Sequence, residues 1–300
     1  MSASRLSPFA VRLLLTLTAA VWAVTFVAGK VAGREATPFA AALWRFALAA
    51  AVLTPLAARS PQGLGASTLG PRGWLTVAAS SLTGLALYNW FFLKGLALVP
   101  VGRGSAVVAA TPTFIYLGSV LVFGEKLTFG RCLGLAAAAL GTMWAVTMGR
   151  PWTAFTGGFG RGDALMLGCM ASWVVYSLLG RPLTNRLSAL AANAWTALGA
   201  VVLLLPMAAL SGEPLGQFLD YGPLTWASIA FLGLGGTVLG FTCFYLAIDV
   251  LGPHMAGVYL NLVPVFGLLA GWLLQDEKPD ASLAVGLALI LFGVRLVQRR

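Results

Sequence analysis

Charged residues are scarce in this chain. Only 9% of its 300 residues are Asp, Glu, Lys or Arg, against roughly 25% in soluble domains, so they cannot cover a globular surface. Disorder is excluded as well, because it requires low hydrophobicity and 59% of the residues are hydrophobic. The net charge of +10 lies mostly between long apolar stretches, and no polar segment interleaves basic with aromatic residues. The sequence therefore predicts a membrane protein whose basic residues meet lipid headgroups, and no nucleic-acid partner.

Residues typical of catalytic, metal and nucleotide sites are also few. The three cysteines are isolated and His254 is the single histidine, so we expect no metal site and no cofactor. The glycine-rich segment 157–160 lacks the Lys-Ser/Thr of a Walker loop, which leaves ATP-driven transport unsupported. These absences predict that the chain is not an enzyme.

Carboxylates are missing from the middle of every apolar stretch. All nine Asp and Glu fall in loops or at the ends of apolar runs. A carrier that exchanges protons for cations normally needs a buried acid with a raised pKa. A neutral or zwitterionic substrate in an uncharged cavity therefore fits better. Any proton coupling would have to use groups near helix ends, such as Asp163, Asp249 or His254.

The chain contains many apolar runs of about 20 residues, which is long enough to cross a bilayer. Ten spans are predicted, at 11–31, 37–57, 73–97, 102–123, 128–148, 162–180, 188–210, 223–248, 254–274 and 281–298. With the N-terminus inside, eleven Lys and Arg lie on the inner side and seven on the outer side. This bias predicts that both termini are cytoplasmic.

The sequence repeats itself at an offset of 151 residues, which becomes 152 after the second span. Trp22 matches Trp173 at the first offset, and Glu125 matches Glu277 at the second. Further matches are Trp44 with Trp195, Pro55 with Pro206, Trp74 with Trp226, Gly84 with Gly236, and Pro112 with Pro264. We therefore expect one five-helix unit at 1–148, a connecting loop at 149–161 and a second unit at 162–300. Because five is odd, the second copy should be inverted, as in transporters whose substrate cavity lies between the repeats.

Two matching motifs carry a family resemblance. Ala110-Thr-Pro-Thr-Phe114 is followed by Gly124-Glu-Lys-Leu127, and Leu262-Val-Pro-Val-Phe266 by Asp276-Glu-Lys-Pro279. With Arg45 in the second span, they resemble the EamA-type branch of the drug/metabolite transporter superfamily, and most of all its YddG-type aromatic amino acid exporters. The resemblance implies export of small metabolites, often amino acids, across a bacterial inner membrane. Pro279 replaces the Leu127 of the first half, so the halves need not move alike.

Aromatic and amide side chains inside the spans are the candidate substrate-binding residues. Tyr and Trp at mid-depth must satisfy an OH or NH group, which favours a position beside a partner or a wet cavity. Ordinary packing and an interfacial belt remain the alternatives. The candidates are Trp22, Tyr88, Asn89, Trp90, Thr111, Trp173, Tyr176, Tyr259 and Asn261, and the candidate hinges are Gly84, Pro112, Gly236 and Pro264.

Other residues have plainer expected roles. Lys30, Lys94 and Arg181 lie near span ends and should reach the headgroups, whereas Arg45 either braces the fold or meets a carboxylate. Gly130, Gly134 and Gly141, with Ser282, Gly286 and Gly293, predict that spans 5 and 10 pack together away from the cavity. We expect a monomer, with a dimer through these spans as the alternative.

The expected function is a secondary exporter of aromatic and other neutral amino acids that works by alternating access. Spans 1, 3, 4, 6, 8 and 9 would line its central cavity. A drug or other metabolite carrier of the same fold is the main alternative, because function depends on the site rather than on the fold. A membrane-embedded enzyme is the weaker one.

Overall fold

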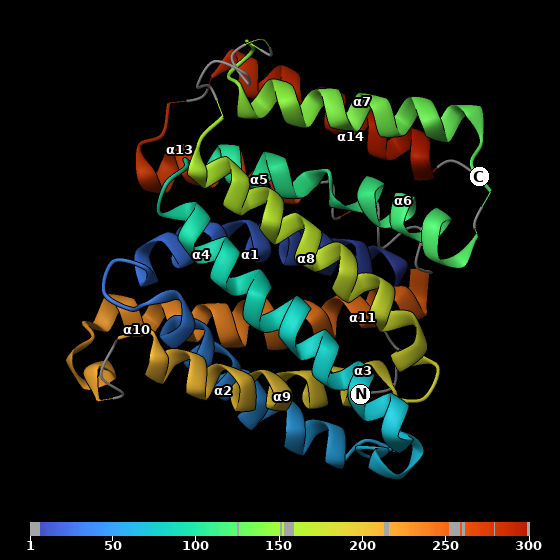
Figure 1. Ribbon diagram of the computed structural model, residues 1–300, viewed down its shortest axis with the longest axis vertical. Coiled ribbons are helices and arrows are strands. Elements are labelled where there is room, and N and C mark those ends of the chain that lie inside the picture. Colours follow the sequence, from blue (N-terminus) through green and yellow to red (C-terminus); the bar gives the residue numbers. More distant parts are fainter. Residues whose placement is uncertain are drawn as a thin grey trace.

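The computed structural model describes residues 7–124, 126–150, 152, 159–212, 216–251, 259, 262–278 and 280–298. Within these ranges the regular structure is helical (Figure 1). Seven helices in this part of the chain are long and apolar enough to cross a membrane, and two shorter ones are also apolar. The chain is thus an all-helical membrane protein over the residues that are described.

The helices follow the predicted spans closely, with two interruptions in the first half. The third span is divided into α3 and α4 by a π-helical segment, and the fourth into α5 and α6 at Ala110. The first-half elements are α1 (Pro8–Ala32), α2 (Pro38–Ala58), α3 (Gly70–Ser80), the π segment Ser81–Leu87, α4 (Tyr88–Leu96), α5 (Val101–Ala109), α6 (Thr111–Phe123) and α7 (Phe129–Val146).

The described elements after residue 160 follow a similar order, and the counterpart of α5 would fall largely outside the described residues. Its elements are α8 (Arg161–Thr184), α9 (Ala189–Leu210), α10 (Pro223–Ala230), the π segment Phe231–Leu239, α11 (Gly240–Leu251), α13 (Val263–Gln275) and α14 (Ala281–Gln298). The two π segments end at Leu87 and Leu239, which are 152 residues apart. Their shared position indicates that the sequence repeat extends to an uncommon local geometry.

Helix ends are repeated at both offsets, 151 residues for the first pair below and 152 for the second. Thr37 and Ser188 begin α2 and α9, and each side-chain oxygen accepts a hydrogen bond from the backbone N–H three residues on. Gly124 and Asp276, which end α6 and α13, both adopt the left-handed conformation, with φ of 67° and 53°. Glycine adopts this conformation without strain, whereas Asp276 is one of the short polar residues that tolerate it.

Helices α7 and α14 pack side by side at one edge of the molecule, and α2 and α9 pack together nearer the opposite edge (Figure 1). A Cβ atom on Gly134 or Gly141 would lie 2.7 Å from the carbonyl oxygen of Gly293 or Gly286 respectively. Only glycine allows backbones to approach this closely. The prediction that spans 5 and 10 pack together is confirmed, and these glycines face each other within the chain.

Four of the tryptophans that match at the repeat offsets form two pairs. The rings of Trp44 and Trp226 are 5.6 Å apart, and those of Trp74 and Trp195 are 4.8 Å apart, both edge to face. This is a favoured aromatic geometry. Because each pair joins one first-half ring to one second-half ring, the tryptophans hold the two halves together.

Candidate functional site

A cavity of about 450 Å³ lies between the helices of the two halves. This volume falls in the range of about 300–1,000 Å³ typical of small-molecule sites. All six spans expected to line it contribute residues. The structure adds α2, through Arg45 and Phe46, and α9, through Asn193 and Thr196. The expected lining was therefore incomplete.

Most of the predicted site residues line this cavity. They are Trp22, Tyr88, Asn89, Thr111, Trp173 and Tyr176, together with the four candidate hinges Gly84, Pro112, Gly236 and Pro264. Trp90 does not line it, because its ring stacks on Phe39 with centroids 6.2 Å apart. Tyr259 packs instead on the cluster of Val11, Leu15 and Ala247. Asn261 lies outside the described residues.

Aromatic rings form a continuous surface across the cavity. Trp173 lies at its centre, with its ring 5.0 Å from Tyr88, 5.0 Å from Tyr176 and 6.2 Å from Phe241. Phe241 in turn lies 5.6 Å from Trp22. These rings come from both halves and offer an apolar surface on which a flat or long apolar group can pack.

The two candidate hinge glycines are sites of close approach. A Cβ atom on Gly84 would collide with the ring of Tyr176, and one on Gly236 would lie 2.8 Å from the Thr25 side chain. The carbonyl oxygen of Gly236 also accepts a hydrogen bond from Trp22 Nε1 at 2.8 Å. Close packing therefore accounts for both glycines in this structure, and their role as hinges stays a prediction.

Arg45 is the polar centre of the cavity and was absent from the predicted site. Its Nη1 donates to Asn89 Oδ1 at 2.8 Å, and its Nε donates to Thr237 Oγ1 at 3.3 Å. Both acceptors are held from behind, because Asn89 Nδ2 donates to the Leu85 carbonyl and the Thr237 hydroxyl donates to the Leu232 carbonyl. The guanidinium is thus fixed between the third and eighth spans.

No carboxylate among the described residues pairs with Arg45. The titratable groups that interact electrostatically with its guanidinium are Tyr88 and Cys169. Since an arginine stays protonated in proteins, the cavity holds one fixed positive charge. The expectation of an uncharged cavity is therefore wrong. Of the acids considered for proton coupling, Asp163 is paired with Arg103 at 2.7 Å, while His254 and the Asp249 side chain are not described.

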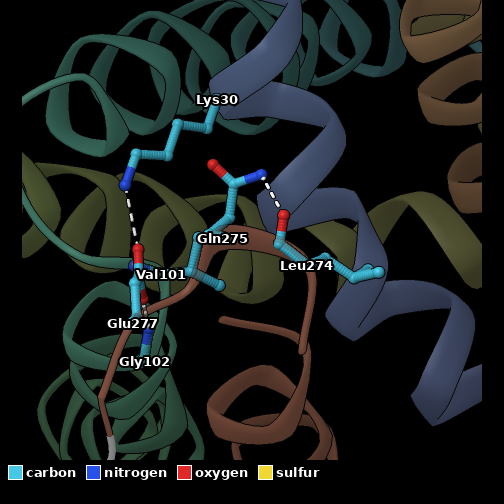
Figure 2. A network of polar contacts seen from close by, with 6 residues as sticks. All are labelled: Lys30, Val101, Gly102, Leu274, Gln275 and Glu277. Carbon is cyan, nitrogen blue, oxygen red and sulfur yellow. Dashed lines mark hydrogen bonds and ion pairs between the residues drawn. The ribbon is translucent and has the colours of Figure 1, made fainter. Parts of the chain in front are cut away.

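A polar network lies about one turn beyond the cavity. Glu277 Oε1 accepts from Lys30 Nζ at 2.9 Å and from the backbone N–H of Val101 at 2.8 Å, while Oε2 accepts from that of Gly102 at 3.2 Å (Figure 2). Lys30 therefore binds Glu277 rather than reaching the headgroups as predicted. Lys94 is exposed, and its contact with headgroups stays a prediction; the Arg181 side chain lies outside the described residues.

The two ends of the cavity differ. Phe26 lies one turn before Lys30 and Ser105 lies one turn after Val101, and both line the cavity, so the Glu277 network covers this end. Helix α8 begins at the same end, where a Cβ on Gly162 would touch Val99. The cavity continues to Leu183 and Thr184 at the far end of α8.

Comparison with known proteins adds the family context. The sequence profile of the EamA-like transporter family matches twice, over residues 10–147 and 160–299. A probable terminal-alkyne amino-acid exporter of Streptantibioticus cattleyicolor is 28% identical, over 95% of this chain and 92% of its own. The aromatic amino acid exporter YddG of Ancylobacter novellus is 27% identical, over 85% and 86%. A riboflavin transporter of Rhizobium johnstonii is 28% identical, over 75% and 70%.

Proposed function

Because this chain belongs to the EamA-like transporter family, we propose that it is a secondary transporter that exports aromatic and other neutral amino acids. The observation that carries this proposal is the cavity of aromatic rings around Trp173, with one cationic group at Arg45. An amino acid with an apolar side chain matches both features. The names of two relatives as amino-acid exporters support the same substrate class.

We propose further that the fold consists of ten membrane spans in two inverted five-helix units, at 1–148 and 162–300, with both termini cytoplasmic in a bacterial inner membrane. The double family match, the repeated π segments and the repeated helix ends support two units. In this orientation the Glu277 network closes the outer end, and the cavity extends towards the cytoplasm. Transport would proceed by opening the outer end while the far end closes.

The test is counterflow in proteoliposomes. Vesicles preloaded with unlabelled amino acid should accumulate radiolabelled Phe, Met and Thr faster than protein-free vesicles, with the largest rate for Phe. Parallel runs with and without a pH gradient would show whether protons are coupled to transport. If none of these solutes crosses faster than in empty vesicles, the proposed function is wrong.

A carrier of larger flat ring systems is the second candidate. The aromatic cavity surface suits such a ligand, and one relative is named a riboflavin transporter. Riboflavin in excess over labelled Phe separates the two possibilities. An amino acid exporter should keep its Phe counterflow, whereas a flavin carrier should transport riboflavin itself and lose any Phe signal to competition.

A further inference from the structure

We infer that the guanidinium of Arg45 binds the carboxylate of the transported substrate, so that the protein selects carboxylates and rejects amines that lack one. This inference rests on the proposed function and narrows its substrate class. The substrate's carboxylate is then the group that the protein recognises, and its amino group contributes less to binding.

The donors of Arg45 are only partly used. A guanidinium carries five N–H donors in a planar fork. One donor each from Nε and Nη1 is engaged by Thr237 and Asn89, and no other acceptor for Arg45 is found among the described residues. Arg45 lines the cavity, and its Nη2 lies beside Gly236, 3.8 Å from where a Cβ atom on that glycine would stand. The remaining N–H donors of Arg45 therefore belong to a side chain that lines the cavity and have no acceptor among the described residues.

The partners of Arg45 position it without neutralising it. Asn89 and Thr237 are neutral acceptors, and each is fixed by its own hydrogen bond to a backbone carbonyl. A positive charge held inside a membrane protein is costly unless an opposite charge meets it. Among the described residues the protein supplies no such charge, so an incoming carboxylate would provide it through a charge-assisted hydrogen bond, which is stronger than a neutral one.

The surroundings determine what the rest of the substrate should be. Tyr88 precedes Asn89 in the chain, and its ring lies 5.0 Å from Trp173. Phe241 lies one helical turn after Thr237 and stacks on the same tryptophan. A carboxylate at Arg45 thus places an attached ring or apolar chain among these aromatics. An amine with the same ring gains the packing but meets the like charge of Arg45.

The direct test compares three ligands that share one ring. Phenylalanine, 3-phenylpropanoate and phenethylamine differ only in which charged groups they carry. We expect 3-phenylpropanoate to inhibit Phe counterflow within a few-fold of phenylalanine, and phenethylamine to be about 10- to 100-fold weaker, the range for one lost hydrogen bond to a charged group. Equal inhibition by phenethylamine and 3-phenylpropanoate would overturn the inference.

An isosteric variant tests the role of Arg45 while keeping the side-chain shapes. Asn89→Asp places a carboxylate at hydrogen-bond distance from Nη1, so it should neutralise the site and weaken 3-phenylpropanoate binding about 10- to 100-fold. Asn193→Asp is the matched control, because Asn193 lines the same cavity without a hydrogen bond to Arg45. Intrinsic tryptophan fluorescence of purified protein measures binding independently of transport. An equal loss in both variants, or no loss in Asn89→Asp, contradicts the assignment.

The outcomes for the two proposals are separable. If 3-phenylpropanoate binds and crosses while no amino acid does, amino acid export fails and the carboxylate site stands. If amino acids cross but phenethylamine competes equally, export stands and the carboxylate site fails. If no ligand binds or crosses, both proposals are wrong.

Discussion

The two segments matched by the family profile share a framework but differ in cavity chemistry. At the repeat offsets, Arg45 corresponds to Thr196 and Asn89 corresponds to Phe241, although all four residues line the cavity. The packing glycines, the tryptophan pairs and the π segments are kept in both halves. The comparison teaches that the two matched segments share these scaffold features, whereas the charged residue that lines the cavity, Arg45, lies in the first segment.

The largest expected effect tests the shared scaffold. Gly141→Leu and Gly293→Leu occupy matching positions, and a Cβ at either would lie 2.7 Å or 2.5 Å from a carbonyl oxygen on the partner helix. Each should lower the free energy of unfolding by about 1–3 kcal/mol or more, as overpacking does. Thermal unfolding in detergent measures this. Gly130→Leu is the control, because nothing lies within 4 Å of its Cβ. A clear difference in the loss of stability between the two matched variants would show that the two helices do not contribute equally to this contact.

The next prediction contrasts the matched tryptophans of the cavity. Trp22 is held by its hydrogen bond to Gly236, whereas the Trp173 indole N–H donates to no described residue. Trp173→Ala should therefore weaken Phe binding by about 2 kcal/mol, or roughly thirtyfold, with little change in stability. Trp22→Ala should mainly lower the melting temperature. Trp90→Ala, outside the cavity, should change Phe affinity little. Equal affinity losses at the two cavity positions would show that both halves bind substrate alike.

A smaller effect is expected at the end that Glu277 covers. Glu277→Gln removes the ion pair with Lys30 and one of the acceptors for the α5 backbone. The covered end should therefore open more often. The reporter is Ser105→Cys in a protein whose native cysteines are replaced by alanine. It should react several-fold faster with an impermeant maleimide applied from that side. Glu125→Gln changes the matching residue of the first half and should not accelerate labelling there. Unchanged labelling in Glu277→Gln would show that the network does not close this end.

The smallest effect concerns pH. The backbone N–H of Gly222 and the Thr225 hydroxyl hold the pKa of the Glu35 carboxyl below its usual value of 4.5. The folded pKa lies below the unfolded one, so this link stabilises the fold above about pH 4.5 and is lost as the pH falls through the folded pKa. The melting temperature of Glu35→Gln should therefore be slightly lower than that of the unsubstituted protein at pH 7. In acid the two melting temperatures should be equal.

A hydrogen bond made by the residue that matches Glu35 in the second half provides the control. Arg186 matches Glu35 at the repeat offset, and its carbonyl oxygen accepts from the Thr68 hydroxyl at 3.1 Å. Since neither group titrates in this range, the small loss of stability in Thr68→Ala should be the same at every pH. A pH-dependent loss in Thr68→Ala would show that the pH effect does not arise at Glu35.

The sequence predicts features that depend on spacing better than those that depend on helix rotation. The spacing of small residues identified the glycines between spans 5 and 10, and the repeat offset paired the cavity residues Trp22 and Trp173. Trp90 was grouped with Tyr88 and Asn89 because they are adjacent in sequence, yet successive helical residues point about 100° apart and Trp90 faces Phe39. Thr237 lies in a π segment, where the 3.6-residue period fails, so no periodicity argument could place it beside Arg45.

The Glu277 contact has a consequence for leakage. One carboxylate ties together the end of α1, the start of α5 and the turn after α13. A single rotation of that side chain would release all three elements together, so the barrier would be either intact or gone, with few half-released states. A carrier built this way could move bulky solutes without offering small ions a continuous path.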